Sequence, residues 1–332
     1  MPTNETILRL NQAGLETTRG TGVAATRKLY ATIAPSYDRP ITEFSDTSGT
    51  FEDLRRVAYQ RPNIGFAATD LMTYEDTAWW FQSLIKGGVT GVTDAGSPPA
   101  YTYGFTPSLA TDDLKTFTLE FNESGNPYKS TQVLNTDWTI RIDPDNEGGW
   151  LLDANFIARD WNTATYTGSI TDRTTEVIKA PGTLLYIDSA TIGTTQVTGK
   201  FISATVTGDN APHLKAFAED ELSWPANKVG RGRRRFTAQF VLEFDSDTEF
   251  ANYRATTPVE RYIRIERSGT QIHGSTATNK RIRLDMNGYW RSISWGDRQG
   301  NIIATFGFQP FYDATSGYAL KAEVVNALVT LP

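Results

Sequence analysis

The chain has 332 residues with a formal net charge of −6, and 39% of them are hydrophobic and 21% charged, which predicts two domains and excludes a disordered chain. With no cysteine and only two histidines, His213 and His273, it cannot form disulfides, thiolate metal sites or a multi-histidine cage. We therefore expect no metal, no cofactor and no enzymatic activity. No apolar run approaches the ~18 residues of a membrane-spanning helix, and we expect neither a signal peptide nor a membrane partner.

Charge is divided unevenly along the chain. Acidic residues outnumber basic ones in residues 1–165, whereas basic residues slightly outnumber acidic ones in residues 166–332. Two interpretations stay open: unlike halves of neighbouring copies attract each other, or the difference is surface drift without a role. The overall negative charge argues against a general nucleic-acid binder that neutralises phosphates.

In chain order, the polar stretch at residues 1–28 predicts an N-terminal arm. Strand-like runs follow at 29–33 and 61–69, separated by a long connection that we expect to be irregular. The Gly-, Pro- and Ser-rich stretch 87–113 and the Gly- and Thr-rich stretch 268–280 are also expected to be irregular.

A helix is predicted after the second of these runs. Thr73 resembles an N-cap, and Asp76 follows three residues later, where a carboxylate complements the helix dipole. Apolar residues at helical spacing continue to Ile85, and Gly87 and Gly88 predict the end of the helix.

Most other segments alternate apolar and polar residues with a period of two. This pattern predicts strands with one buried and one polar face, and the many Thr, Val, Ile and aromatic residues suit strands. Runs of this kind cover residues 117–121, 138–142, 152–156, 201–206, 236–244 and 282–286.

A second helix is predicted to begin at Ser246, with Glu249 in the capping-box position and Pro258 as the stop. Residues 29–88 and 201–258 therefore share the order strand, long irregular connection, strand, helix, although their sequence identity is slight. An ancient duplication and the chance recurrence of a common motif both explain this order.

The segment from Asp143 to Gly148 places carboxylates at alternate positions before a glycine, loosely like a calcium loop. The twelfth position of such a loop would be Ala154, where a bidentate glutamate is required. We therefore favour an Asp- and Gly-rich hairpin turn.

Other motifs also fall short of a catalytic site. Neighbouring carboxylates admit a glycosidase pair, but adjacent residues on a strand or loop usually point apart. These carboxylates are Asp112, Asp113, Glu219, Asp220 and Glu221. Gly20 and Gly22 lack the preceding strand that a nucleotide-binding fingerprint needs.

One dense basic cluster remains, formed by Arg231, Arg233, Arg234 and Arg235. Phosphate binding and a solvent-facing strand start are both open interpretations. We favour a contact between subunits, because arginine is enriched at interfaces.

Several segments in order resemble the tail tube proteins (major tail proteins) of long-tailed bacteriophages, in their two-domain variety. The segments are ETTRGTGV at 16–23, AATRKL at 24–29, KTFTLE at 115–120, FIAR at 156–159, RFTAQFVLEF at 235–244 with the helix after it, and a closing strand at 317–326 that ends in Val325 and Asn326. The resemblance covers nearly the whole chain, and its specificity comes from the order of the segments.

The resemblance implies a mainly β chain with two tail-tube-type β-sandwich or barrel domains, each with a short flanking helix. The arm would span residues 1–28, the first domain 29–165 and the second 166–332. Copies would form stacked rings, hexameric or trimeric and pseudo-hexameric, whose inner strands join into a continuous barrel.

The resemblance also implies partners and location. The chain would be a structural protein of the virion, assembled in the host cytoplasm alongside other phage tail proteins. DNA would pass through the lumen during ejection without specific binding, and an acidic lumen would repel its phosphates.

Two alternatives from other classes stay open. One is a β-sandwich module of the tail that binds carbohydrate or a receptor through exposed tryptophans such as Trp290 and Trp295. The other is the glycosidase already considered.

Overall fold

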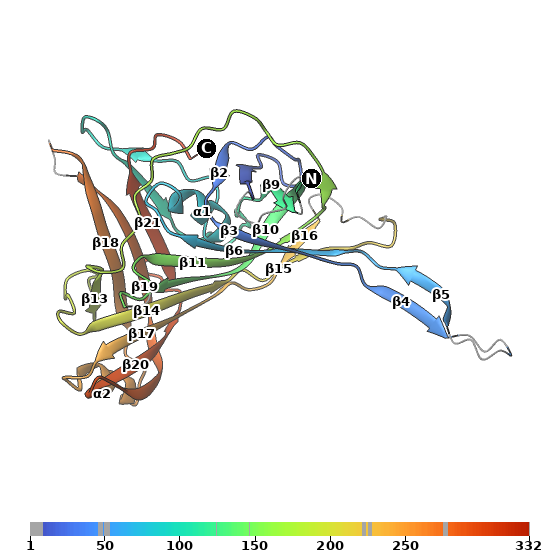
Figure 1. Ribbon diagram of the computed structural model, residues 1–332. Helices are drawn as coiled ribbons and strands as arrows, with labels where there is room; N and C mark the ends of the chain where they lie inside the picture. Colours follow the sequence, from blue (N-terminus) through green and yellow to red (C-terminus); the bar gives the residue numbers. More distant parts are fainter. Residues whose placement is uncertain are drawn as a thin grey trace.

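The structure, a computed structural model, describes residues 9–45, 49, 54–123, 125–145, 147–220, 224, 228–274 and 278–331. Within these ranges the chain forms strands β1 to β21 and helices α1 and α2 (Figure 1). The prediction of a mainly β fold is confirmed.

Eight strands form one antiparallel series that runs through both halves of the chain, and we call it the long sheet. Its order is β3 (Thr32–Asp38), β6 (Asn63–Leu71), β11 (Trp150–Ala158), β10 (Asn126–Ile142), β14 (Phe201–Asp209), β17 (Arg235–Glu243), β20 (Asn301–Pro310) and β19 (Thr278–Arg298). Alternate residues of these strands are buried, as the period-two pattern predicted.

Two further layers cover the core side of the long sheet. In the first half, β2 (Arg27–Leu29), β1 (Asn11–Leu15) and β9 (Phe117–Glu123) continue onto the first part of β10, which also pairs with β12 (Asn162–Thr163). In the second half, the order is β13 (Leu184–Asp188), β18 (Arg261–His273), the first part of β19, β21 (Leu320–Asn326), β8 (Tyr101–Phe105) and β7 (Val92–Thr93). A single hydrophobic core lies between the layers.

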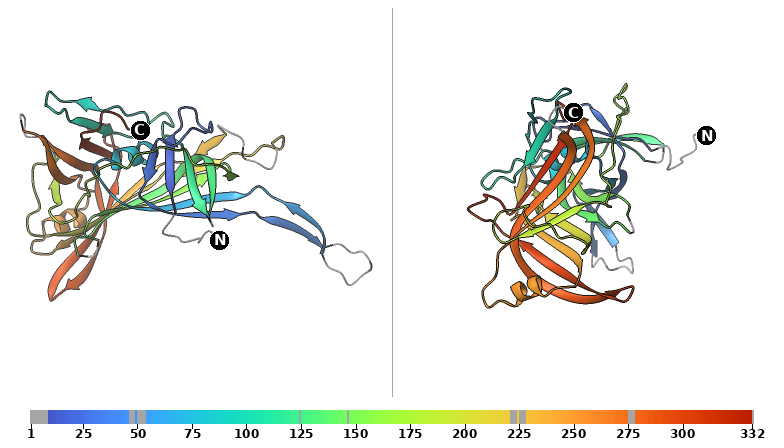
Figure 2. Two further views of the ribbon diagram at one scale, coloured as in Figure 1. Left: turned by 45° about the horizontal axis from the view of Figure 1, so that its top comes forward. Right: turned by 90° about the vertical axis from the view of Figure 1, so that its left-hand side faces the viewer.

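The two long connections that were expected to be irregular contain hairpins instead. The first holds β4 (Ile41–Ser45) and β5 (Leu54–Tyr59), which project far from the body (Figure 2). The second holds β15 (Pro212–Leu214) and β16 (Val229–Arg231).

Two other stretches expected to be irregular contain strands. The stretch 87–113 is irregular, as expected, except for β7 and β8, and β8 pairs with the C-terminal strand β21. Most of 268–280 belongs to the β18–β19 hairpin. Within residues 1–28, β1 and β2 are tied into the first outer layer.

Helix α1 (Thr77–Leu84) starts four residues later than predicted, and its N-cap is Asp76. The Thr73 hydroxyl still accepts a hydrogen bond from the Asp76 backbone N–H at 3.1 Å, but this bond closes the turn before the helix. The prediction of Thr73 as N-cap is therefore wrong by about one turn. The helix ends close to the predicted glycines, and all eight of its residues are buried.

Helix α2 (Thr248–Arg254) has Asp247 as its N-cap, so the predicted capping box at Ser246 and Glu249 is also wrong. The Glu249 carboxylate accepts two hydrogen bonds from Arg261 at 3.0 Å and one from Trp290 Nε1 at 2.7 Å. These partners lie far away in the sequence, and they hold the side chain away from the helix start.

These findings predict different effects for the two cap substitutions. Thr73→Ala removes a buried hydrogen bond and is expected to lower the free energy of unfolding by about 1 kcal/mol. Ser246→Ala changes an exposed side chain and is expected to stay within about 0.5 kcal/mol of wild type. Chemical denaturation of both variants measures the difference, and equal destabilisation would contradict the assigned helix starts.

Both halves of the chain follow the same pairing order. In the first half the order is β1–β9–β10–β11–β6–β3, and in the second it is β13–β18–β19–β20–β17–β14. In the first half, the β4–β5 hairpin connects β3 to β6, and α1 follows β6. In the second half, the β15–β16 hairpin connects β14 to β17, and α2 follows β17.

The register of the two halves agrees in detail. Asn63 faces Asp38 where Arg235 faces Asp209, and Phe156 occupies the place of Phe308. A β-bulge follows Asn135 opposite Phe156, and another follows Trp290 opposite Phe308. The pairing repeat therefore extends to single residues, which favours a duplication over chance.

Two strand pairings among the described residues join the halves: β10 with β14 in the long sheet, and β8 with β21 in the second outer layer. Residues 176–180 also form backbone hydrogen bonds with the first half, such as Tyr74 N–H to the Glu176 carbonyl at 3.1 Å and Trp150 N–H to the Ile178 carbonyl at 2.8 Å. The expected boundary at 165/166 falls in the connection between β12 and β13.

A buried charged cluster lies beside α1. The Arg173 Nη2 atom is 2.6 Å from Asp76 Oδ1, and the fully buried Arg27 has its Nη1 3.6 Å from the same oxygen. Asp70 accepts a hydrogen bond from Trp80 Nε1 at 2.7 Å. Burial raises the pKa of Asp70 to about 6, against the opposing effects of the Trp80 hydrogen bond and Arg27.

Candidate assembly surfaces

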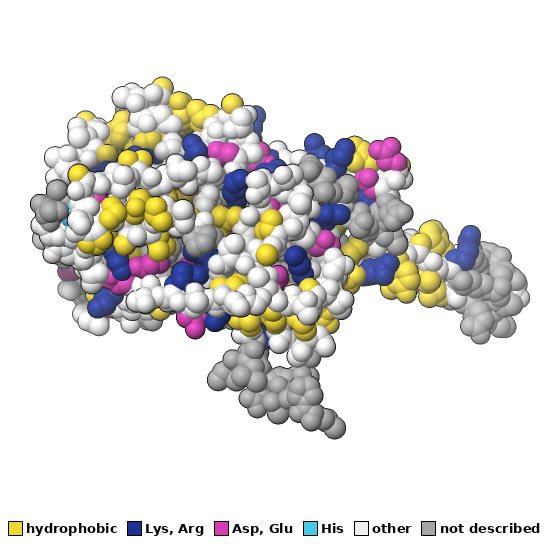
Figure 3. All heavy atoms as spheres, turned by 90° about the horizontal axis from the view of Figure 1, so that it is seen from above, with side chains coloured by type: hydrophobic (Ala, Val, Ile, Leu, Met, Phe, Trp, Pro, Cys, Tyr) yellow, Lys and Arg dark blue, Asp and Glu magenta, His cyan; other side chains and the backbone are white. Residues whose placement is uncertain are grey.

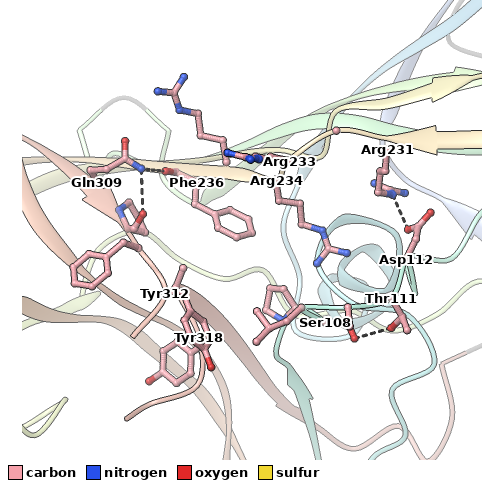
Figure 4. Close-up of a pocket in the computed structure, with 18 residues that line it drawn as sticks. Ser108, Thr111, Asp112, Arg231, Arg233, Arg234, Phe236, Gln309, Tyr312 and Tyr318 are labelled. Carbon is pink, nitrogen blue, oxygen red and sulfur yellow. Dashed lines mark hydrogen bonds and ion pairs between the residues drawn. The ribbon is translucent and has the colours of Figure 1, made fainter. Parts of the chain in front are cut away.

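The predicted arginine cluster lines one wall of a cleft with a volume of about 610 Å³ (Figure 4). Arg231 lies at the end of β16, and Arg233, Arg234 and Arg235 lead into β17. The opposite wall comes from the loop after β8 and from the residues after β20, including Phe311 and Tyr312. The cleft therefore combines guanidinium groups with aromatic side chains.

Two of these arginines are held by carboxylates of the same chain. Arg231 Nε lies 2.6 Å from Asp112, which also binds Arg19 at 2.9 Å, and Arg234 lies 3.6 Å from Asp113. Burial raises the pKa of Asp112, but the hydrogen bonds and charges of Arg231 and Arg19 outweigh this effect and lower it. A carboxylate stabilised in its charged form is a poor general acid, so the geometry gives no support to a glycosidase pair here.

Arg233 and Arg235 differ from their neighbours. Both are exposed, and the described residues bring no carboxylate within ion-pair distance of either. The predicted interface cluster thus divides into two arginines that brace the cleft and two that are available to a partner.

Within the described ranges, the long sheet ends in two unpaired edges. At one end, β3 pairs with β6 alone. At the other end, residues 289–298 of β19 pair with β20 alone, because the pairing with β18 ends at Gly288. Such edges are templates for strands of another chain, and Pro35 on β3 is a residue that edge strands tolerate.

Large apolar side chains are exposed on these edges and on the projecting hairpin. Tyr37 on β3 is 51% exposed, and Trp295 on β19 is 49% exposed. The hairpin exposes Ile41, Phe44, Leu54, Val57 and Tyr59, and Figure 3 shows hydrophobic side chains along it. These exposed apolar side chains make the edges and the hairpin candidate contact surfaces.

The face of the long sheet opposite the core is covered mainly by small, uncharged polar side chains. They include Thr69, Asn155, Thr139, Thr205, Thr207, Thr237, Gln239 and Thr305. Arg141 on this face binds Asp153 at 2.9 Å. Arg235 stands opposite Asp209 in the strand register but outside ion-pair distance.

The turn from Asp143 to Gly148 joins β10 and β11, so the interpretation as a hairpin turn is confirmed. Arg141 lies 3.3 Å from Glu147, and Arg298 binds Asp145. In the described part of the chain, no three His, Cys, Asp or Glu side chains are grouped so as to hold a metal ion.

Other sequence candidates are dispersed. Asp220 lies beside Arg61, and Glu219 is near it in the second hairpin, whereas Glu221 falls outside the described residues. His213 lies on β15, and the buried His273 contacts Asp94 through Nε2 at 2.7 Å. Gly20 donates its N–H to the buried Glu16 at 2.8 Å.

Of the two tryptophans considered for carbohydrate binding, only Trp295 is exposed. Trp290 is 5% exposed and packs against Phe240, Phe306 and Phe308, so its predicted exposure is wrong. A pair of stacking platforms on this strand is therefore absent.

Sequence reasoning missed the two open edges and the hairpin. The only sign of them in the sequence is that apolar residues such as Phe44 and Val57 occur among polar neighbours. Whether a strand lies at the edge of a sheet depends on how all the strands pair, and the local sequence pattern of one strand does not show this.

The sequence matches no protein-family model, and a search of curated proteins finds no match either. Neither helix in the described ranges has the length and apolar character needed to cross a membrane.

Proposed function

We propose that the chain is a structural subunit of a bacteriophage tail tube, in which copies join edge to edge into rings that stack around a DNA-conducting lumen. The observation that carries the proposal is that the long sheet has an open edge at each end. Its two halves are joined by the pairing of β10 with β14, and we expect copies to join through the equivalent strands. The sequence resemblance to tail tube proteins supports the same assignment.

The internal join between β10 and β14 is a template for the join between copies. Asp137 to Ile142 pair with Asp209 to Ala204. By the register of the repeat, residues 292–297 of β19 are equivalent to 137–142, and residues 33–38 of β3 are equivalent to 204–209. We expect β3 of the next copy to pair with this open edge of β19.

This seam would bury the exposed apolar side chains at both edges. Trp295 of one copy would lie opposite Pro35 of the next, and Ile293 opposite Tyr37. In the internal template the corresponding pairs are Ile140 with Val206 and Trp138 with Gly208. A head-to-tail contact of this kind closes into a ring when the rotation between copies permits it.

Each copy would contribute two equivalent repeats to the ring. A trimer then presents six similar units around its axis, which is the pseudo-sixfold arrangement that the resemblance implies. The polar face of the long sheet would line the lumen, since most of its side chains are small and uncharged and its Arg141 is held by Asp153, which leaves DNA phosphates little to bind.

Electron microscopy of the purified chain tests the proposal. We expect rings or tubes with a hollow centre, formed alone or alongside tail-assembly partners. Particles that remain small monomers under all of these conditions would contradict it.

A further inference from the structure

The strands of the long sheet end at two rims. In a ring closed through the β3–β19 seam, the rims form the two end faces, because the strands of a closed barrel run from one rim to the other. The β10–β11 and β19–β20 turns lie at one end, which we call the turn rim. The starts of β6 and β17 lie at the other end, which we call the arginine rim because it carries Arg233 and Arg235. Rings stacked in one orientation bring these two rims into contact.

The arginine rim holds the cleft of about 610 Å³, which is open in the single chain. Arg233 and Arg235 are exposed on one side of it, and none of the described carboxylates lies within ion-pair distance of either. Phe311, Tyr312 and Leu109 lie on the other side and are 37%, 47% and 71% exposed (Figure 4). The cleft therefore suits a partner that presents a carboxylate beside an apolar side chain.

The end of the β19–β20 hairpin, residues 297–302, has this complementary character, and we call it the tip. Its turn is tight, since Gln299 and Gly300 have positive φ angles of 54° and 88° and the Asp297 carboxylate accepts the Gly300 N–H at 3.2 Å. Asp297 pairs with Ile302 across the hairpin, and both are exposed, Ile302 to 59%. The neighbouring Arg298 binds Asp145, and no cation in the described ranges lies within ion-pair distance of Asp297.

The β10–β11 turn at the same rim is less suited to the cleft. Its Asp145 binds Arg298, and its Glu147 lies 3.3 Å from Arg141. Both carboxylates are thus already neutralised within the chain, so entry into the cleft would break an existing ion pair. The tip brings a carboxylate that has no such partner to lose.

The tip and the cleft lie at the two ends of the same strand. Ile302 is the second residue of β20, whereas Gln309 and Pro310 at its end line the cleft. In a ring, the two features therefore lie in the same layer of the wall but on opposite end faces, and a rotation of one ring about the axis brings each tip over a cleft. Such a head-to-tail contact does not close, so it continues from ring to ring.

We infer that the tip of each copy docks into the arginine cleft of a copy in the adjacent ring, with Asp297 against Arg233 and Ile302 against Phe311 and Tyr312. The inference rests on the proposed function, because it requires rings that stack. It assigns two different jobs to two surfaces: the β3–β19 seam closes each ring, and the tip and the cleft join one ring to the next.

Site-directed cross-linking tests this contact, and the chain has no native cysteine to interfere. Leu109→Cys and Asn301→Cys place one thiol at the cleft and one at the tip, at exposed positions that leave Asp297 and Arg233 in place. Assembled tubes of this variant are treated with a short bismaleimide and separated in denaturing gels. We expect a ladder of covalent oligomers that runs beyond the number of copies in one ring.

A matched control and the other outcomes separate the possible failures. Val92→Cys combined with Asn301→Cys should give no ladder, because Val92 is 71% exposed, like Leu109, but does not line the cleft. Tubes that form without a Leu109–Asn301 ladder would overturn the inference and leave the proposed function intact. A ladder that stops at the ring size would also overturn it, since the contact would then lie within a ring. Absence of rings from the unmodified chain would count against the proposed function itself.

A charge exchange gives a second readout. Arg233→Asp is expected to shorten the tubes about tenfold in electron micrographs while single rings still form, because it places two carboxylates against each other at every ring-to-ring contact. Adding Asp297→Arg to the same chain reverses both charges and should restore most of the length. Tubes of the combined variant that stay as short as those of Arg233→Asp would contradict the assigned pairing.

Discussion

Asp70→Asn is expected to raise the free energy of unfolding by about 2 to 3 kcal/mol at pH 7.5 and to change it little at pH 4. Burial raises the pKa of this carboxyl from 3.8 to about 6, so the folded chain retains a proton that the unfolded chain has lost between these values. The free energy of unfolding therefore falls as pH rises from about 4 to about 6, and the loss persists above that. Asparagine keeps the acceptor for Trp80 Nε1 and removes the ionisation.

Denaturant titrations across this pH range measure the effect. Asp297→Asn is a matched control, because Asp297 is exposed, and it should stay within about 0.5 kcal/mol of wild type at every pH. A constant difference between Asp70→Asn and wild type at pH 4 and pH 7.5 would contradict the buried position of Asp70.

Local patterns predicted the strands well, because alternation reports which face of a strand is buried. The runs at 152–156 and 236–244 fall within β11 and β17 with the expected faces inward. The tryptophans of β19 show where this reasoning fails. Strict alternation puts Trp290 and Trp295 on opposite faces, but the bulge after Trp290 shifts the parity and places both on the core side.

The helix starts were missed for a related reason. Thr73 and Asp76 do form a hydrogen-bonded turn, and a cap and a turn of this kind have the same sequence signature. Glu249 was assigned to a capping box, but Arg261 and Trp290 compete for its carboxylate from other elements. A local turn therefore explains the first error, and partners distant in sequence explain the second.

The candidate site was predictable only in part. The density of arginines at 231–235 predicted a subunit contact, which stays a prediction, and it gave no sign that Asp112 and Asp113 hold two of these arginines within the chain. The equivalence of Arg235 with Asn63 has no sequence signal, because the repeats share little identity. It emerges only from the register of the paired strands.

Trp295→Arg is expected to abolish ring formation while the chain still folds. Its indole is half exposed in the single chain and would be buried against Pro35 of the next copy. Losing an aromatic anchor at the centre of an interface costs about 2 kcal/mol or more, which weakens each contact about thirtyfold. A closed ring requires every contact at once, so the loss is compounded. Sedimentation velocity and electron microscopy measure the assembly, and thermal melting checks the fold.

Val92→Arg is the matched control, since Val92 is 71% exposed on β7, away from both edges, and its replacement should leave assembly unchanged. Tyr37→Arg should block assembly from the other edge. Each variant keeps one intact edge, so a mixture of Trp295→Arg and Tyr37→Arg copies can form one seam and no second. Heterodimers that do not grow further would therefore identify β3 and β19 as partners, whereas rings in the mixture or in either variant alone would contradict the seam.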